Sequence, residues 1–265
     1  MEHQGFVVAI REQSERFLEV LAGVDPQAPV PSCPGWTAAD LLWHLGVVQH
    51  FWAEVARGAT EDDVVPPNRP DDVAALGTLV ARSGTELLGA LAGREPSDET
   101  WSWHPDGGSI AWLTRRQAHE ALIHRVDAEL TAGVDVRPPS AELALDGVDE
   151  VLTVFVDGVP EWGAFAPDGV RVLITSTNLP GRWLLSLGRF TGTGPDTGTA
   201  HDLDAAAVSR VADDAGAGVV DAEVAGHAWD LDRWLWGRGD VDGLEISGST
   251  PVVDRVRALV AGATE

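Results

Sequence analysis

The stretch that decides the fold of this chain covers residues 116–129 and reads Arg116-Gln117-Ala118-His119-Glu120-Ala121-Leu122-Ile123-His124-Arg125-Val126-Asp127-Ala128-Glu129. Residues four apart lie one turn apart on the same face of a helix. A helix over this stretch therefore places the Glu120 carboxylate beside the His124 imidazole. Such a pair can bind one divalent metal ion, provided that another element supplies a further ligand.

The spacing of the histidines disfavours a metalloprotease. His119-Glu120 resembles the start of the motif His-Glu-x-x-His, whose two histidines lie four residues apart on one helix. His119 and His124 are five apart, so at about 100° per residue they lie about 140° apart around the axis. Glu120 and His124 are only about 40° apart on the same reckoning. We therefore retain Glu120 and His124 as candidate metal ligands, and we expect His119 to face another element or solvent.

A candidate for the third ligand is His44, in the run Trp43-His44-Leu45-Gly46. It lies on an earlier segment with helical apolar spacing, and helical bundles build metal sites in their cores from facing helices. Taken alone, His44 could be a hydrogen-bonded core residue, and the Glu120–His124 pair could lie on a solvated helix face. The sequence places all three side chains on predicted helices without deciding between these possibilities.

The composition indicates a globular protein. The chain has 265 residues, of which 44% are hydrophobic and 23% charged. No run approaches the roughly 18 consecutive apolar residues of a membrane span. The net charge of −24 argues against nucleic acid or an anionic membrane as a partner. The absence of lysine excludes Schiff-base chemistry and a Walker-type phosphate loop.

Cysteine content and the first residues bear on the expected compartment. The single cysteine, Cys33, excludes an internal disulfide framework. The N-terminus lacks the basic and apolar regions of a signal peptide, so we expect a cytoplasmic protein. Cys33 itself is expected to pack structurally, because no base lies near it in the sequence.

Apolar periodicity and breaker residues divide the chain into two parts, which makes the predicted fold class α+β. Residues 1–137 are predicted to form a four-helix bundle, and residues 138–265 a smaller α+β domain. The predicted bundle helices cover residues 2–23, 38–57, 71–92 and 110–132. In the second part we predict helices at 141–157, 227–236 and 251–262, strands at 170–174, 183–187, 219–224 and 244–246, and a loop at 191–200.

The start of the second helix carries an acidic variant of the capping box, with Thr37 before the helix and Asp40 three residues later. Asp40 also precedes His44 by four residues. From there its carboxylate could accept a hydrogen bond from the imidazole nitrogen that does not bind metal. We expect the capping role.

Two pairs of motifs together resemble a known family. They read Cys33-Pro34-Gly35-Trp36-Thr37 with Asp40-Leu41-Leu42-Trp43-His44-Leu45-Gly46, and His119-Glu120 with His124-Arg125-Val126-Asp127-Ala128-Glu129. This combination resembles the mycothiol-dependent maleylpyruvate isomerase family, within the DinB-like superfamily of metal-binding bundles. A weaker likeness to the family's sterol-carrier-like second domain covers Gly226-His227-Ala228-Trp229-Asp230-Leu231 and Leu235-Trp236-Gly237-Arg238.

The resemblance implies a divalent metal, usually zinc, held by His44, Glu120 and His124. It also implies a low-molecular-weight thiol, mycothiol, as cosubstrate. Members differ widely in substrate, so the activity in the family's name is not carried over. The expected partners are a small-molecule substrate and the thiol, and the expected state is a monomer or homodimer.

We therefore expect a metal-dependent enzyme in which the thiol adds to, or isomerises, a small electrophilic substrate, as an isomerase or an S-transferase. Arg125 is the candidate catalytic residue, because a guanidinium can bind an anionic substrate through two hydrogen bonds. It could instead pair with Glu129, one turn further along the helix.

Two other functions remain open at this point. A non-catalytic protein that binds a small ligand, with a structural metal or none, would suit the eleven tryptophans. Hydrolysis by metal-bound water would need a general base, for which His119, His50 or a carboxylate are candidates.

Overall fold

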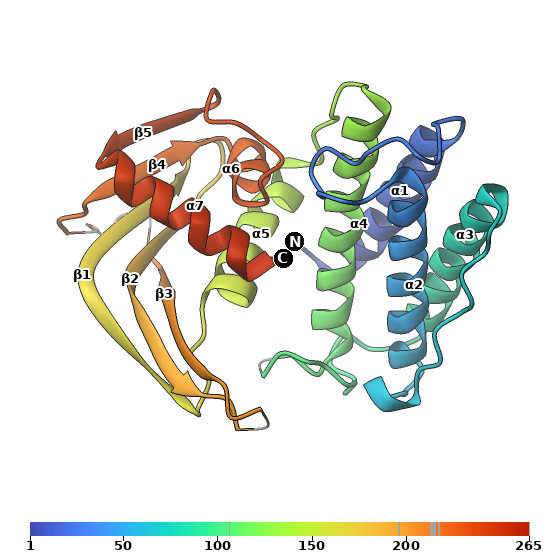
Figure 1. Ribbon diagram of the computed structural model, residues 1–265, viewed down its shortest axis with the longest axis horizontal. Coiled ribbons are helices and arrows are strands. Elements are labelled where there is room, and N and C mark those ends of the chain that lie inside the picture. The colour runs from blue at the N-terminus through green and yellow to red at the C-terminus, as the bar shows by residue number, and fades with distance from the viewer. Residues whose placement is uncertain (106, 196, 213–215, 217, 265) are drawn as a thin grey trace. The chain divides into compact units, whose positions relative to one another are not determined.

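The computed structural model describes residues 1–105, 107–195, 197–212, 216 and 218–264. Contacts within the chain divide it into two compact units, Met1–Pro138 and Pro139–Glu265 (Figure 1). The first unit is built from helices, and the second combines helices with one sheet. The predicted α+β fold class is therefore confirmed.

The first unit is a four-helix bundle. Its helices are α1 (His3–Leu21), α2 (Ala38–Ala56), α3 (Val73–Leu91) and α4 (Ile110–Ala132), with a short 3-10 helix η1 (Glu61–Asp63) between α2 and α3. Helix α1 packs mainly against α4, and α2 mainly against α3, while α2 also contacts α4. The last of these contacts matters most for the site described below, because it brings the helix that carries His44 against the helix that carries Glu120 and His124.

Capping residues explain where the bundle helices begin. Thr37 Oγ1 accepts a hydrogen bond from the Asp40 amide at 3.3 Å, and Asp40 Oδ2 accepts one from the Thr37 amide at 2.9 Å. These two bonds complete the predicted capping box. Hydrogen bonds from Thr37 and from Arg69 lower the pKa of Asp40 to about 2. Asp40 therefore caps α2, as expected. Gly133 closes α4 in the left-handed conformation.

The second unit is a five-stranded sheet in the order β3-β2-β1-β4-β5. All neighbouring strands are antiparallel except β1 and β4. The strands are β1 (Gly163–Ser176), β2 (Arg182–Thr193), β3 (Ala200–Arg210), β4 (Ala222–Gly226) and β5 (Leu244–Gly248). Three helices cover one face of the sheet (Figure 1), namely α5 (Ala141–Glu150), which continues as the π-helix η2 (Val151–Val156), α6 (Ala228–Leu235) and α7 (Thr250–Thr264).

The sequence-based prediction was wrong for one whole strand. Strand β3 was missed, because its sequence is rich in Ala and Asp, residues that strands generally avoid. It forms because all eleven of its residues pair with β2. The predicted strand 170–174 lies in the C-terminal half of β1, and the predicted strand 183–187 in the N-terminal half of β2, where burial is greatest. The other halves of both strands extend beyond the local apolar signal. The predicted loop 191–200 shrinks to a turn, of which residue 196 lies outside the described residues.

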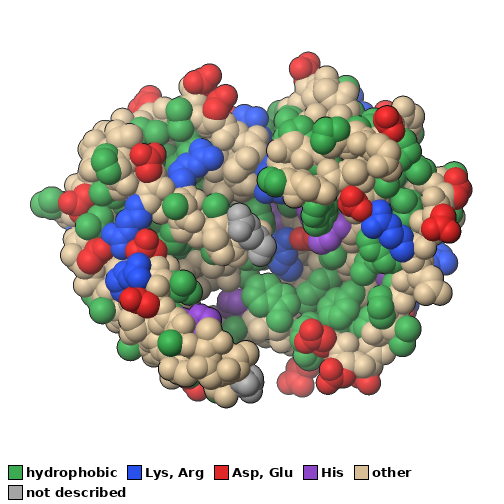
Figure 2. All heavy atoms as spheres, in the orientation of Figure 1, with side chains coloured by type: hydrophobic (Ala, Val, Ile, Leu, Met, Phe, Trp, Pro, Cys, Tyr) green, Lys and Arg blue, Asp and Glu red, His purple; other side chains and the backbone are tan. Residues whose placement is uncertain are grey.

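Acidic side chains are scattered over the visible face of both units, as the composition leads one to expect (Figure 2). Within the described part of the chain, no helix combines the length and the apolar character needed to cross a bilayer.

The capping box offers a test of the bundle. We expect Thr37→Ala to lower the free energy of unfolding by about 1 kcal/mol, because it removes the hydroxyl that caps α2. Urea denaturation of the full chain, followed by circular dichroism, measures this change. Thr60→Ala is the matched control, because Thr60 makes the same box with Asp63 on the exposed helix η1. We expect a smaller loss of unfolding free energy in this control. An equal loss in both variants would contradict the assignment of Thr37 as a stabilising cap of α2.

Candidate metal centre

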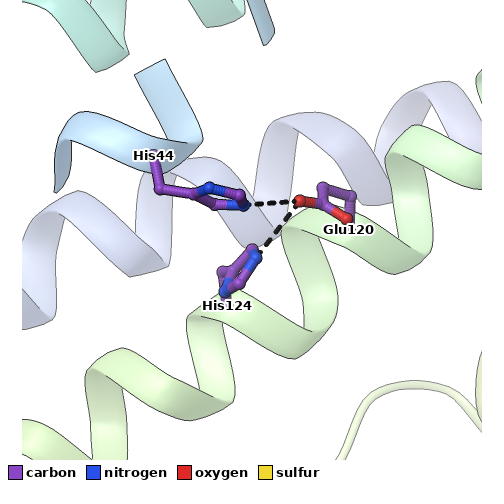
Figure 3. A group of neighbouring side chains, drawn as sticks. All are labelled: His44, Glu120 and His124. Carbon is purple, nitrogen blue, oxygen red and sulfur yellow. Dashed lines mark hydrogen bonds and ion pairs between the residues drawn. The ribbon is translucent and has the colours of Figure 1, made fainter. Parts of the chain in front are cut away.

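Three predicted side chains converge between α2 and α4 (Figure 3). His44 Nε2 and His124 Nε2 each lie 3.1 Å from the same oxygen, Glu120 Oε1. One ligand atom from each residue lies within 4.8 Å of the others. The structure therefore brings together His44, Glu120 and His124, which the sequence analysis had named as candidate ligands.

The donor set fits a divalent metal ion. Two imidazole nitrogens and one carboxylate oxygen are ligands that zinc accepts, and three protein ligands leave one position open for a small molecule. Among the described residues, this is the one group of three or more His, Cys, Asp or Glu side chains close enough to share an ion. The geometry thus gives the predicted site a concrete location in the bundle.

A buried arginine holds the second oxygen of Glu120. Arg116 Nη2 donates to Glu120 Oε2 at 2.6 Å, one turn before Glu120 on α4. Oε1 is left to face the two histidines. Burial alone would raise the pKa of Glu120. The charge of His124, hydrogen bonds from both histidines and the charge of Arg116 instead hold it well below its ordinary value. Glu120 is therefore an anion, ready to bind a cation.

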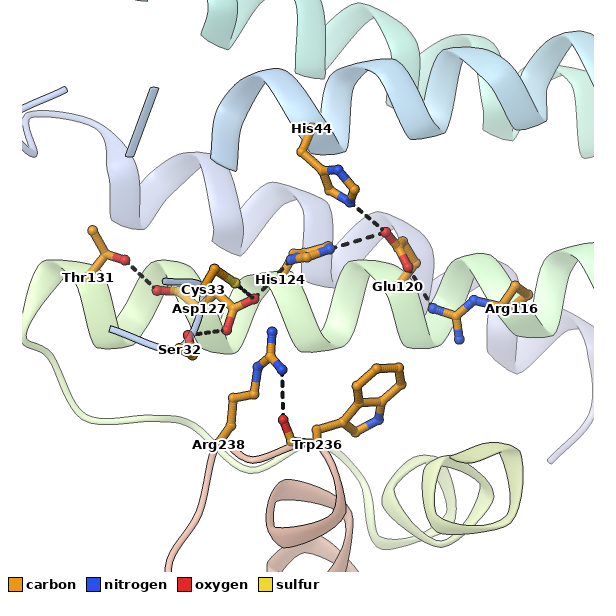
Figure 4. Close-up of polar contacts among 10 residues, drawn as sticks. All are labelled: Ser32, Cys33, His44, Arg116, Glu120, His124, Asp127, Thr131, Trp236 and Arg238. Atoms are coloured by element: carbon orange, nitrogen blue, oxygen red, sulfur yellow. Dashed lines mark hydrogen bonds and ion pairs between the residues drawn. The ribbon is translucent and has the colours of Figure 1, made fainter. Parts of the chain in front are cut away.

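His124 is held between two carboxylates (Figure 4). Its Nε2 faces Glu120, and its Nδ1 lies 2.9 Å from Asp127 Oδ2. Burial would lower the pKa of His124, but the charges of Glu120 and Asp127 and the hydrogen bonds to them raise it to about 9. In the absence of a metal, His124 is therefore an imidazolium near neutral pH.

An aromatic side chain and an open pocket border the centre. The centroid of the Trp36 ring lies 4.8 Å from that of the His44 ring and 6.3 Å from that of the His124 ring, to which it is nearly parallel. A pocket of about 410 Å³ reaches His44 and is lined by Gly35, Trp36, Asp40, Trp43, His44 and Val47. A small molecule can thus approach the centre from the side of α2.

The other residues singled out in the sequence lie elsewhere or act structurally. Arg125 donates to Glu129 Oε2 at 2.5 Å, to Gln13 Oε1 at 3.0 Å and to the carbonyl of Arg137 at 2.6 Å. The Arg125–Glu129 pairing is present, whereas the catalytic role of Arg125 stays a prediction. His119 packs its ring against Phe6 of α1, so it faces another element, as expected.

Two residues of the centre, Arg116 and Asp127, were not predicted from the sequence as site residues. Arg116 precedes Glu120 by four positions and Asp127 follows His124 by three, so both spacings place the partners on one helix face. The signal was available, but the sequence did not show that both side chains are buried there. An exposed helix carries the same spacings as ordinary surface ion pairs.

Comparison with known proteins agrees with this geometry. Residues 7–129 match the family model described as the mycothiol maleylpyruvate isomerase N-terminal domain. This match assigns residues 7–129, which lie within the first unit, to that domain family. The match contains the whole candidate centre, from His44 to His124.

Solved structures extend the likeness from the first unit to the fold of nearly the whole chain. Two crystal structures of the mycothiol-dependent maleylpyruvate isomerase, one of them a His-to-Ala variant, each align with a TM-score of 0.58 and 16% sequence identity. Each alignment covers 95% of this chain and 95% of the other. At this identity, the likeness establishes the fold and leaves activity to the site itself. None of the curated proteins matches the chain significantly.

The protonation of His124 predicts how metal binding depends on pH. Because its pKa rises from 6.5 to about 9 on folding, His124 stabilises the metal-free protein fully below pH 6.5. That contribution is lost as the pH rises through about 9. A metal ion needs the neutral ring and competes with this proton. We expect the increase in Tm on adding one equivalent of zinc to grow from pH 6.5 to about 9.

Thermal denaturation of metal-free and zinc-loaded protein across this range measures the effect. His124→Ala is the control and is expected to abolish the zinc-dependent increase. An increase in Tm that falls as the pH rises would contradict the assignment.

Proposed function

We propose that this protein is a metal-dependent enzyme that uses a low-molecular-weight thiol, mycothiol or a similar one. The thiol adds to, or isomerises, a small electrophilic substrate. The observation that carries the proposal is the convergence of His44, Glu120 and His124 beside an open pocket. Membership of the bundle in the mycothiol maleylpyruvate isomerase N-terminal domain family supports the choice of cosubstrate.

In this proposal His44, Glu120 and His124 hold the metal, and zinc fits their donor set. A divalent metal with an open position lowers the pKa of a thiol, so that the nucleophilic thiolate forms near neutral pH. Arg116 donates to Glu120 Oε2, which leaves Oε1 facing the histidines. Trp36 packs beside both imidazoles at the edge of the pocket.

The reaction needs one bond to form at an electrophilic carbon. The thiol's sulfur forms that bond, and the proton that the thiol loses goes to the adduct. If the new carbon–sulfur bond persists, the product is an S-conjugate and the protein acts as an S-transferase. If it breaks again, the thiol leaves with a proton and the substrate is left as an isomer. The solved isomerase structures with this fold make isomerisation the first reaction to assay.

Metal content is the first experimental test of this proposal. We expect wild-type protein to carry a near-stoichiometric divalent metal, and His44→Ala and His124→Ala to lose it, because each removes one of three ligands. Elemental mass spectrometry of the purified proteins measures the content. His50→Ala is a matched control on the same helix as His44, because His50 Nε2 bonds to the Val65 carbonyl away from the centre. Wild type that stays metal-free after incubation with zinc would contradict the proposal.

Thiol-dependent conversion of an electrophile tests the chemistry separately. We expect metal-loaded wild type to convert the electrophile only when thiol is present, with the thiol consumed if an S-conjugate forms and regenerated if an isomer forms. We expect His44→Ala to be slower by on the order of 100-fold or more, since the metal supplies several kcal/mol of catalysis. A non-catalytic binding protein would show no turnover and would keep its ligand affinity in His44→Ala. Absence of metal- and thiol-dependent conversion of the electrophile across a varied panel would favour that alternative.

A further inference from the structure

The Asp127 carboxylate lies on the far side of the His124 ring from Glu120 (Figure 4). Asp127 Oδ2 accepts a hydrogen bond from His124 Nδ1 at 2.9 Å, while His124 Nε2 lies 3.1 Å from Glu120 Oε1. Both nitrogens of the ring are therefore held, one on each side. The ring can neither flip nor rotate without breaking a hydrogen bond to a charged group.

Asp127 is itself held in place by the loop that leads into α2. Ser32 Oγ donates to Asp127 Oδ1 at 2.5 Å, and Cys33 Sγ lies 3.5 Å from Asp127 Oδ2. The Asp127 side chain is fully buried. The same loop carries Trp36, which packs on the rings of His44 and His124. One short segment thus positions both the carboxylate behind His124 and the aromatic ring beside it.

The chemistry of a histidine ligand gives this arrangement a consequence. A neutral imidazole has one nitrogen that carries a proton and one whose lone pair can bind a metal. An ionised carboxylate can only accept, so Asp127 requires the proton on Nδ1 and leaves the Nε2 lone pair facing Glu120 and His44. An asparagine in its place could accept or donate, and would not select between the two tautomers.

We propose that Asp127 is a positioning residue of the metal centre, which fixes the tautomer and orientation of His124 and thereby sets the affinity for the metal. Ser32 and Cys33 fix Asp127 in turn. The inference rests on the proposed function, because it assumes that His124 binds a metal. Loss of such a carboxylate partner costs about 10–100-fold in metal affinity in comparable sites.

Two buried carboxylates allow a matched comparison. We expect Asp127→Asn in the full chain to bind zinc about 10–100-fold more weakly, measured by competition with a chromophoric chelator. Asp149→Asn is the control. Asp149 is a buried carboxylate of the second unit that accepts from Trp183 Nε1 at 2.9 Å and from Arg210 Nε at 2.6 Å. This control is expected to bind zinc as wild type does.

A spectroscopic signature separates positioning from loss of stability. Cobalt(II) in place of zinc gives an absorption spectrum that reports ligand geometry. We expect this spectrum to change in Asp127→Asn and to stay the same in Asp149→Asn. Zinc affinity within about threefold of wild type together with an unchanged cobalt spectrum in Asp127→Asn would overturn the inference.

A measurement on the wild type keeps the inference testable if Asp127→Asn does not fold. Nitrogen-15 NMR of zinc-loaded protein distinguishes the two tautomers of each histidine, with His124 assigned by comparison with His124→Ala. We expect the proton of His124 on Nδ1, and a proton on Nε2 would overturn the inference. Failure of wild type to bind zinc would instead refute the proposed function, so the two failures are distinguishable.

Discussion

The meeting of two imidazoles at one carboxylate oxygen is the interaction on which the functional centre depends. A buried carboxylate is unfavourable unless it is paired, because it loses its hydration. Here Glu120 is compensated by His44 from one helix and by His124 and Arg116 from its own. The contact between α2 and α4 therefore has an electrostatic as well as an apolar basis. A divalent cation at the same point would supply the compensating charge directly.

Helix α4 carries a second buried ionic network of a different kind, one turn beyond His124. Glu129 accepts from Arg16 Nε at 3.1 Å, from Arg125 Nη1 at 2.5 Å and from the Arg137 amide at 3.0 Å. Guanidinium groups stay charged at all accessible pH values, so this network is permanently paired. The imidazoles of the metal centre can lose their protons and become ligands. Helix α4 thus carries a fixed ionic contact with α1 and an adaptable site that faces α2.

Fold and function rest on different observations in this protein. The likeness to solved isomerase structures, at 16% identity, covers nearly the whole chain and establishes the architecture. One fold can host many activities, so function must be argued from the site. The side chains that carry the argument lie within the helical unit, and their chemistry follows from distances in that unit alone. The sheet of the second unit completes the architecture shared with those structures.

The sequence by itself determined the features that depend on local spacing. It placed the four bundle helices to within about two residues, identified the Thr37–Asp40 cap and put Glu120 and His124 on one helix face. Only the tertiary structure decided how distant segments meet. Strand β3 exists because it pairs with β2, against the preference of its own residues. Asp127 matters because Ser32 and Cys33, almost a hundred residues earlier, reach it in a buried position. Periodicity shows which face of a helix a side chain lies on, but burial and partners are set by packing between elements far apart in the chain.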